Sequence, residues 1–421
     1  MSLSLPQLQA ALTSALADPA VQADALACRI GLHLALSAEN GTPEDSTLTL
    51  WPGDTRVGQL ICRARWKVWQ QVFTPVPAVG YQSFGALRRR PHEFTVEGSE
   101  LNWVQALPLL ERLLEAMRLH PASRSTETPR HFDALRHLRG RYVQLARTPD
   151  TWAYSEECGN SQAPALLMLH TAGSDARQWH GLMAQATLRA QWHLLCFDLP
   201  GHGRSPLPAG QANWTWRLSQ AQYIDWILRY LDAMQIERVT LMGCSMGAAI
   251  GLALLAQHPD RFVGGVLLET PYCSPGRRSP YLNHAEVHGA RLSAAWVGAL
   301  LSPTSPTSGR DQATWIYSQA APSVYDGDLA FYSDEFNAHD HTAHIDTART
   351  PLWLLTGDYD YSATPADTAR VSNEIPGVQY RELPGFGHFP MVENPDGLLP
   401  HLQAPLAALY AHIQGLHEEN P

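Results

Sequence analysis

Three features that would place a chain in a large functional class are missing from these 421 residues. There is no block of Lys or Arg, and the formal net charge is -10, which argues against nucleic acid or an anionic membrane as the main partner. No apolar run approaches the roughly 20 residues that span a bilayer. The six cysteines form no Cys-x-x-Cys pair, so neither a zinc site nor a disulfide framework is indicated. We therefore expect a small-molecule or protein partner and no membrane insertion.

The beginning of the sequence also lacks the basic region and unbroken apolar stretch of a signal peptide. Together with scattered cysteines, which suit a reducing compartment, this predicts a cytoplasmic protein. Hydrophobic residues make up 45% of the chain, enough for a sizeable core. The length suggests two domains, one of them large.

The first 125 residues predict a small α+β domain. Residues 5–29 have helical spacing, residues 47–51 and 57–63 alternate like the strands of a hairpin, and residues 107–117 form an amphipathic helical pattern. The order of these elements faintly resembles a sterol-carrier-type lipid-binding domain. An appendage that packs on the rest of the chain or mediates homodimerisation is the alternative. We place a polar linker at 126–134 and the second domain at 135–421.

The second domain predicts an α/β fold. An opening hairpin is followed by apolar runs that alternate with helical patterns, which indicates a mostly parallel sheet covered on both faces. Ligands in such sheets bind beyond the carboxyl ends of the strands. The expected strands are 141–147, 151–155, 164–170, 192–197, 239–242, 262–268, 351–356 and 378–383.

One stretch predicts a catalytic nucleophile. The apolar run 239–242 leads into Gly243-Cys-Ser-Met-Gly247 and then into a helical pattern. Small residues two before and two after Ser245 allow the strained turn that exposes a nucleophilic hydroxyl at a helix N-terminus. The backbone N–H of Met246 could there stabilise a developing oxyanion.

Three further loops follow expected strands and should gather at the same sheet edge. Small residues after His170 could turn the backbone N–H of Ala172 inward as a second oxyanion donor. In a later loop, Asp358 and Asp360 compete for the role of orienting a histidine. His388, in a glycine-flanked loop, is the expected general base because Ser, Asp and His then follow in order along the chain.

From about residue 131 to 421, the chain resembles the α/β-hydrolase superfamily, particularly its bacterial serine esterase and hydrolase branch. The segments that carry the resemblance are Leu169-His-Thr-Ala-Gly173, Asp198-Leu-Pro-Gly-His-Gly-Arg-Ser205, Gly243-Cys-Ser-Met-Gly247, Thr356-Gly-Asp-Tyr-Asp-Tyr-Ser362 and Gly387-His-Phe-Pro390. The resemblance implies Ser245 as nucleophile, His388 as base, and Asp360 rather than Asp358 as the acid. It implies oxyanion donors at Met246 and at Ala172 or Thr171. The amino-terminal extension departs from ordinary members and leaves the substrate open.

Residues 272–345 interrupt the alternation of strands and helices and would form a helical cap over the site. Five aromatic residues in this segment are candidates for the substrate pocket, although each could equally hold the cap to the body. His339, His341 and His344 match no strong zinc pattern, so we expect a solvated loop and no metal. The pocket candidates are Trp315, Tyr317, Tyr325, Phe331 and Tyr332.

The sequence thus predicts a serine hydrolase that needs no cofactor and cleaves an ester of a small or medium, largely apolar substrate through an acyl-enzyme. The same three residues would serve an amide or carbamate, a lactone or a carbon–carbon bond. A ligand-binding protein that keeps the fold without catalysis is the alternative from another class.

Overall fold

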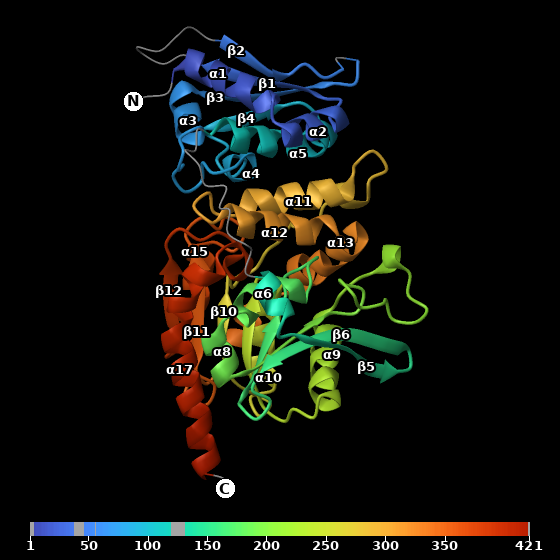
Figure 1. Ribbon diagram of the computed structural model, residues 1–421, viewed down its shortest axis with the longest axis vertical. Helices are drawn as coiled ribbons and strands as arrows, with labels where there is room; N and C mark the ends of the chain where they lie inside the picture. The colour runs from blue at the N-terminus through green and yellow to red at the C-terminus, as the bar shows by residue number, and fades with distance from the viewer. Residues whose placement is uncertain (1–3, 38–45, 55, 119–130, 420–421) are drawn as a thin grey trace.

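The computed structural model describes residues 4–37, 46–54, 56–118 and 131–419, and they form two separate sheets. Figure 1 shows the small sheet at one end of the molecule, the large sheet at the other and a layer of helices between them. The predicted linker at 126–134 lies largely outside the described residues. The two-domain division therefore stays a prediction, although each sheet has its own covering helices.

The large sheet has the order β12-β11-β10-β9-β7-β8-β6-β5. Its six strands from β12 to β8 are parallel, while β6 pairs antiparallel with both β8 and β5. This confirms the predicted α/β fold with an opening hairpin and a mostly parallel sheet. The strands are β5 (Arg139–Arg147), β6 (Asp150–Gly159), β7 (Ala165–Leu169), β8 (His193–Asp198), β9 (Val239–Cys244), β10 (Phe262–Leu268), β11 (Leu352–Gly357) and β12 (Gln379–Leu383).

Helices cover both faces of this sheet. The helix α10 (Met246–Gln257) follows β9, and its residues 246–255 are all buried, so it is a core helix that is apolar all round. The 25-residue α17 (Pro395–Glu419) runs along one side of the molecule (Figure 1). No helix in the described part of the chain is both long and apolar enough to cross a membrane. The others are α6 (His131–Leu135), η1 (Ala176–Trp179), α7 (His180–Met183), α8 (Ala186–Gln191), η2 (Asn213–Thr215), α9 (Gln220–Ala233), α15 (Pro365–Glu374) and α16 (Pro390–Glu393).

The small sheet corrects the predicted hairpin. Its order is β2-β1-β3-β4, so β1 (Gly31–Ser37) lies between β2 (Ser46–Trp51) and β3 (Gln59–Arg65). β1 pairs antiparallel with β2 and parallel with β3. The two strands expected to pair directly are therefore separated by a strand that the prediction omitted, although Leu32, Leu34 and Leu36 alternate in the sequence. β4 (Phe94–Glu97) completes the sheet beside β3.

The helices of the amino-terminal domain also refine the prediction. Residues 5–29 form two helices, α1 (Leu5–Leu16) and α2 (Pro19–Ala27), because Asp18 caps the second helix and Pro19 begins it. The expected amphipathic helix is longer than its apolar pattern and forms α5 (Glu100–Met117). Two short helices, α3 (Trp66–Val72) and α4 (Phe84–Leu87), lie between β3 and β4.

The predicted cap region between β10 and β11 is helical. It contains η3 (Pro280–Asn283), α11 (Gly289–Leu300), α12 (Thr307–Ser318), α13 (Pro322–Ala330), η4 (Phe331–Glu335) and α14 (His339–Thr342).

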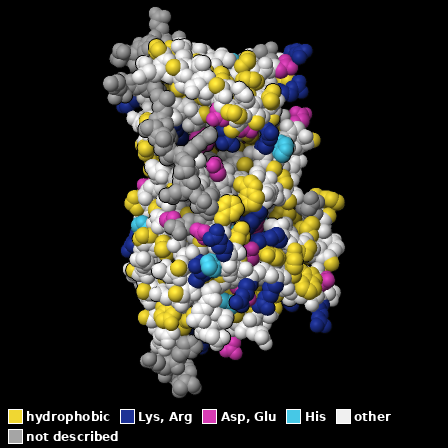
Figure 2. Space-filling model, viewed as in Figure 1, with side chains coloured by type: hydrophobic (Ala, Val, Ile, Leu, Met, Phe, Trp, Pro, Cys, Tyr) yellow, Lys and Arg dark blue, Asp and Glu magenta, His cyan; other side chains and the backbone are white. Residues whose placement is uncertain are grey.

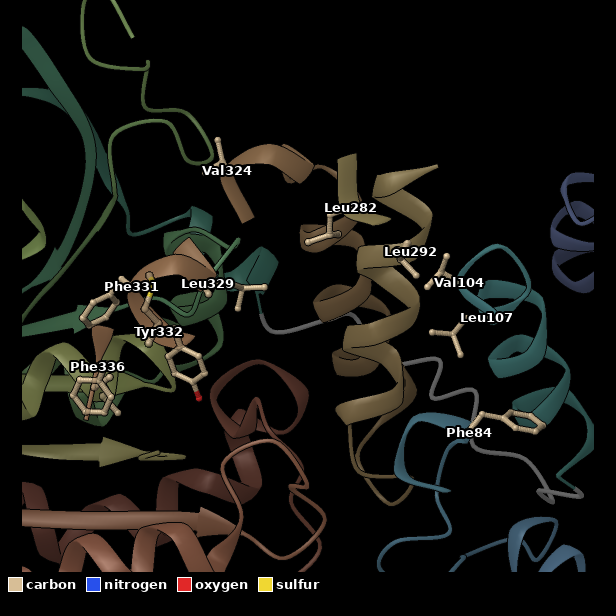
Figure 3. Close-up of a cluster of buried hydrophobic side chains, with 14 of the residues drawn as sticks. Phe84, Val104, Leu107, Leu282, Leu292, Val324, Leu329, Phe331, Tyr332 and Phe336 are labelled. Atoms are coloured by element: carbon tan, nitrogen blue, oxygen red, sulfur yellow. The ribbon is translucent and has the colours of Figure 1, made fainter. Parts of the chain in front are cut away.

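The amino-terminal domain packs on this cap. Val104 and Leu107 of α5 face Leu292 of α11 across an apolar contact, and Phe84 of α4 lies beside them (Figure 3). All four side chains are buried. The apolar face of α5 is thus shared between its own sheet and the cap, as expected of an appendage that packs on the rest of the chain.

Charged side chains on the surface are mixed in sign. On the face shown in Figure 2, Lys and Arg are interspersed with Asp and Glu and with apolar side chains. No extended basic patch appears on that face, in agreement with the charge pattern of the sequence.

Candidate functional site

Ser245 lies at the junction between β9 and α10, with φ 54° and ψ -112°. This is the left-handed region, which a residue with a side chain rarely adopts. A Cβ atom on Gly243 would lie 2.3 Å from the carbonyl oxygen of Gly247, and one on Gly247 would lie 2.4 Å from that of Leu169. Both flanking positions therefore require glycine, and the turn is the strained strand-to-helix elbow that the sequence predicted.

Two side chains from later loops meet Ser245. His388 Nε2 lies 2.9 Å from Ser245 Oγ, and His388 Nδ1 lies 2.5 Å from Asp360 Oδ2. All three residues are buried, with 5%, 3% and 4% of Ser245, Asp360 and His388 exposed. The structure thus brings together the three residues proposed from the sequence, in the geometry of a nucleophile, a base and an orienting acid.

The two competing aspartates occupy different environments. Asp360 Oδ1 accepts the backbone N–H groups of Ser362 at 2.6 Å and Ala363 at 3.2 Å, which leaves its other oxygen for His388. Asp358 instead accepts the backbone N–H of Gly385 at 2.9 Å. The geometry therefore favours Asp360 for the role that residue patterns alone left open.

A second acidic residue, Glu269, lies beside Asp360 in the interior. It directly follows β10, has a φ of 51°, and accepts the backbone N–H of Gly357 at 3.0 Å. Burial, with the nearby Asp360 carboxylate, holds the pKa of Glu269 well above its usual range, and the two side chains share a hydrogen bond. A protonated Glu269 can donate to Asp360 and so help to fix the orienting acid.

In the part of the chain that the structure describes, two backbone N–H groups near Ser245, of Met246 and Ala172, are free to serve as the expected oxyanion donors. Met246 is the first residue of α10, so its N–H has no partner within the helix. Ala172 lines the same cavity, and no acceptor within the described residues takes its N–H. Thr171 N–H instead donates to Gln178 Oε1 at 3.1 Å. The geometry therefore favours Ala172 over Thr171 as the candidate second oxyanion donor, because the Thr171 N–H is already used.

The cap holds the loop after β7, residues 170–175, which we call the oxyanion loop after its expected role, through a buried carboxylate, Asp328 of α13. It accepts the backbone N–H of Gly173 at 2.8 Å, and it contacts His202 Nε2 at 2.6 Å. Trp216 Nε1 donates to its other oxygen at 3.0 Å. His202 therefore connects one loop of the sheet edge to the cap, and its hydrogen bonds within the described residues go to Asp328 and Pro200 rather than to Ser245.

This pair predicts a pH dependence of stability. Burial alone would lower the pKa of His202, but the Asp328 carboxylate outweighs it and the net pKa lies above the ordinary value of 6.5. The stabilisation is therefore fully present below about pH 6.5 and is lost as the pH rises through the higher folded-state value. We expect the urea midpoint of the wild type to exceed that of His202→Gln most at pH 6 and least at pH 8.5. A difference between the two midpoints that does not change with pH would contradict this account.

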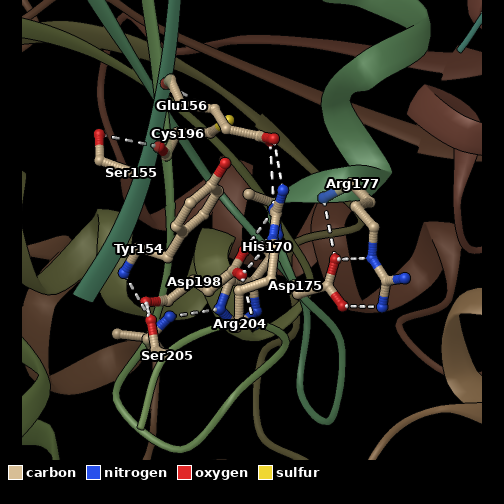
Figure 4. A network of polar contacts seen from close by, with 12 residues as sticks. Tyr154, Ser155, Glu156, His170, Asp175, Arg177, Cys196, Asp198, Arg204 and Ser205 are labelled. Atoms are coloured by element: carbon tan, nitrogen blue, oxygen red, sulfur yellow. Dashed lines mark hydrogen bonds and ion pairs between the residues drawn. The ribbon is translucent and has the colours of Figure 1, made fainter. Parts of the chain in front are cut away.

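A network of charged residues holds the loop after β8 at the edge of the sheet where Ser245 lies (Figure 4). Arg204 bridges Glu156 of β6 and Asp198 at the end of β8, where it contacts Asp198 Oδ2 at 2.9 Å. Asp198 Oδ1 in turn accepts the backbone N–H of Ala176 at 2.9 Å, next to the oxyanion loop. Because each of these buried carboxylates is paired, we interpret the loop 198–205 as a structural element and not as part of the reacting groups.

Glu393 of α16 holds the loop that carries His388. Its Oε1 accepts the backbone N–H groups on either side of the base, from Gly387 at 2.8 Å and Phe389 at 3.3 Å. Its Oε2 accepts from Ser302 N at 2.7 Å and Ser305 Oγ at 3.0 Å, both in the cap. Burial raises the pKa of Glu393 to about 7, although these four hydrogen bonds act in the opposite direction.

Replacing Glu393 by Ala should leave four buried donors without an acceptor. Each unsatisfied group costs about 1–3 kcal/mol, so we expect a loss of at least about 3 kcal/mol in unfolding free energy. We also expect kcat to fall roughly ten- to hundredfold, because a displaced imidazole loses its alignment with Ser245. Urea unfolding and ester turnover measure the two effects. The exposed Glu382→Ala is the matched control, and equal behaviour of the two variants would contradict the proposed role of Glu393.

A cavity of about 510 Å³ opens above Ser245 and His388. Of the five aromatic residues expected in a pocket, Tyr317, Tyr325 and Tyr332 line it, and Ser245 Oγ lies 3.3 Å from the Tyr332 hydroxyl.

The remaining two aromatic candidates do not line the cavity, which corrects the sequence prediction. Trp315 is 47% exposed and lies under the Arg177 guanidinium. Because Trp315 and Tyr317 are two residues apart in α12, their side chains point to opposite sides of the helix. Phe331 is fully buried and packs against Tyr223 and Phe336 instead.

The three cap histidines do not converge. His339 Nδ1 lies 3.0 Å from Glu374, whereas His341 Nε2 lies 3.0 Å from Gln220. His339 and His341 lie in the short helix α14, His344 lies just after it, and His341 is buried. The expectation of a solvated loop is therefore wrong in part. The cluster of possible ligand atoms found in the described residues is that of Glu269, Asp360 and His388, whose atoms are engaged with one another.

Sequence reasoning missed Glu269, Asp328 and Glu393. A signal existed for Glu269, because a carboxylate directly after a buried parallel strand is the pattern that singled out Asp358 and Asp360. No local sequence pattern marks Asp328 or Glu393. Each contacts a loop more than 80 residues away in the chain, and the path of that backbone is known only from the fold.

Comparison with known proteins gives one matching family model, described as the alpha/beta hydrolase fold, over residues 164–395. A pimeloyl-[acyl-carrier protein] methyl ester esterase from Aeromonas hydrophila is 30% identical over 116 residues. This match spans 28% of the present chain and 41% of that relative, so less than two thirds of its length is covered.

Two solved structures share the fold. The enol-lactonase from Burkholderia xenovorans superposes with a TM-score of 0.53 at 22% identity, covering 61% of this chain and 97% of that one. A thermophilic esterase from Thermogutta terrifontis gives a TM-score of 0.56 at 18% identity, covering 65% and 99%. At these identities the likeness concerns the fold alone.

Proposed function

Since the chain belongs to the alpha/beta hydrolase fold family, we propose that it is a serine hydrolase that cleaves a carboxylic ester through an acyl-enzyme. The observation that supports this most is the hydrogen-bonded chain from Asp360 through His388 to Ser245 at the base of a cavity. Esterases among the relatives and fold neighbours are consistent with it.

In the proposed reaction, Ser245 Oγ attacks the ester carbonyl carbon while His388 Nε2 takes the hydroxyl proton. The carbonyl oxygen becomes an oxyanion held by the N–H groups of Met246 and Ala172. As the bond to the alcohol breaks, His388 returns the proton to the leaving oxygen, which gives a free alcohol and an acyl-serine. A water molecule, deprotonated by His388, then attacks the acyl carbon and releases the acid and the serine hydroxyl.

The cavity favours a small or medium substrate. Its volume of about 510 Å³ lies within the usual range for small-molecule sites, and tyrosine rings provide much of the wall beside Ser245. We propose a cytoplasmic location as well, which the six free cysteines support.

The test is turnover of p-nitrophenyl acetate, butyrate and hexanoate by the purified full chain, compared with the matching p-nitroanilides. We expect hydrolysis of the esters at a kcat/KM well above that of the anilides. Turnover of the anilides or of a lactone without turnover of any ester would move the assignment to the amidase or lactonase alternatives. A protein that turns over none of them would favour the ligand-binding alternative.

A further inference from the structure

The cavity above Ser245 is rich in arginine. Four guanidinium groups line it, from Arg88, Arg89, Arg277 and Arg278, together with a single carboxylate, Glu100. This is unusual for a chain whose formal net charge is -10. Arginines concentrated in one cleft of an acidic protein indicate a local positive field that can attract an anion.

Two of the four arginines are neutralised by the protein. Arg88 Nη1 contacts both oxygens of Glu100 at 2.9 Å. Arg278 is bound to Asp326 at 3.2 Å and to Asp334 at 3.3 Å. The single carboxylate that lines the cavity, Glu100, is thus paired with Arg88, and Arg278 is paired with carboxylates outside the lining.

Arg89 and Arg277 have no carboxylate partner among the residues that the structure describes. Arg277 donates its Nη2–H to the backbone carbonyl of Ser362, two residues after Asp360. Arg89 and Arg277 line the same cavity, and burial and the like charge of Arg277 both lower the pKa of Arg89. Two positive charges that line one cavity without a counter-charge are costly, and a bound anion would compensate them.

The charge of Arg277 extends into the pocket itself. It lowers the pKa of Tyr325 and Tyr332, although burial acts more strongly in the other direction. Both tyrosines line the cavity, and Tyr332 contacts the nucleophile. A ligand that reaches from Ser245 to Arg277 would thus remain within one continuous cavity.

The two unpaired arginines come from different parts of the fold. Arg89 follows α4 of the amino-terminal domain, and Arg277 lies in the segment between β10 and α11. In Figure 1, α4 lies at the edge of the amino-terminal domain that faces the cap. Tyr361, in the loop between β11 and α15, also reaches the amino-terminal domain, because a Cβ atom on Gly85 of α4 would lie 2.4 Å from its hydroxyl.

We propose that the amino-terminal domain and the cap together build an anion subsite, in which Arg89 and Arg277 bind a carboxylate or phosphate on the ester substrate. The inference rests on the proposed ester hydrolysis and names the class of substrate. Arginine suits this role because its planar guanidinium can donate two parallel hydrogen bonds to an oxyanion. The subsite gives the amino-terminal domain a direct part in substrate selection.

The test compares anionic with neutral esters of equal size. One series varies the acyl side, with p-nitrophenyl monoesters of succinate, glutarate and adipate against acyl chains that end in methyl. The other varies the alcohol side, with butyrate esters of 4-hydroxybenzoate and 4-hydroxybenzamide. We expect the ratio of kcat/KM, anionic to neutral, to exceed about tenfold in at least one series and to fall as salt is raised. A ratio near one throughout, with neutral esters still hydrolysed, would overturn the subsite and leave the proposed function standing.

Variants assign the preference to the two arginines. Arg89→Gln and Arg277→Gln should each lower the ratio at least about fivefold. Arg90→Gln is the matched control, because it removes the same charge at the adjacent position. Arg90 is paired with Glu93 and does not line the cavity. Labelling of each variant by a fluorophosphonate reports whether its site is folded. A ratio that falls equally in the control would contradict the subsite.

Two inhibitors distinguish the possible anions. Competitive inhibition by glutarate, weakened in Arg89→Gln, would support a carboxylate, and inhibition by inorganic phosphate with the same sensitivity would support a phosphate. Failure of both to compete at concentrations up to about 100 mM, together with a ratio near one, would overturn the proposal. If no ester of any charge is hydrolysed, the proposed function itself fails, and the two outcomes are thus separable.

Discussion

Replacement of Ser245 by Ala should lower kcat for p-nitrophenyl butyrate by about four to six orders of magnitude. The variant loses the atom that forms the acyl-enzyme, and only the oxyanion donors and the cavity remain to assist direct attack by water. The fold should be retained, because the backbone at residue 245 has φ 54° and alanine adds no atom to the crowded turn. Purified protein, initial rates and circular dichroism suffice for the measurement.

Ser318→Ala is the control for this variant. Ser318 is exposed at the end of α12 and lies outside the cavity, so its loss should change kcat by less than about twofold. Residual turnover in Ser245→Ala within tenfold of the wild type would exclude Ser245 as the nucleophile.

Asp360→Asn should lower kcat by about four orders of magnitude, the second largest effect that we expect. The neutral amide can no longer stabilise the imidazolium that forms on His388, and its NH2 group can force the wrong tautomer of the imidazole. KM should change much less, since Asp360 does not line the cavity. Steady-state kinetics over a range of ester concentrations separates the two parameters.

Asp358→Asn is a matched control in the same loop. Its carboxylate accepts the backbone N–H of Gly385 and does not reach His388, so kcat should fall less than about tenfold. A larger loss in Asp358→Asn than in Asp360→Asn would reverse the assignment of the orienting acid.

The sequence could predict those parts of the molecule that depend on local pattern. Apolar runs located the strands β7 to β11, because strands buried on both faces are continuous in their hydrophobicity, and alternation located the hairpin of β5 and β6. The elbow at Ser245 was also predictable, since its glycines are required by contacts within a few residues or with the adjacent strand. His388 and the loop that carries Asp358 and Asp360 followed from the rule that strand ends share one edge, whereas the choice of Asp360 over Asp358 came from the family resemblance.

The parts that were missed depend on long-range contacts. Nothing in the pattern of residues 31–37 shows that they form the strand between β2 and β3. Whether an aromatic residue such as Trp315 faces the cavity depends on the rotation of α12, which packing against the body determines. Similarly, the position of Arg89 at the cavity depends on how the amino-terminal domain packs on the cap, which the local sequence does not show.

The amino-terminal domain keeps two open predictions. Its resemblance to a sterol-carrier-type domain and a role in homodimerisation both stay predictions. Its contacts near the orienting acid favour a role within the same chain: Tyr359 donates its hydroxyl to Pro77 at 2.7 Å, and Gln82 donates to the Tyr359 carbonyl at 2.9 Å. Tyr359 directly precedes Asp360, so these contacts connect the domain to the site independently of any bound lipid.

The central claim is that Ser245 is an activated nucleophile. Its most direct test is mass spectrometry of the full chain after reaction with a fluorophosphonate, followed by digestion and identification of the modified peptide. Our account predicts one adduct per chain, located on Ser245 and absent from Ser245→Ala and, at short reaction times, from His388→Ala. An unmodified chain, or an adduct on another residue with Ser245 intact, would contradict it.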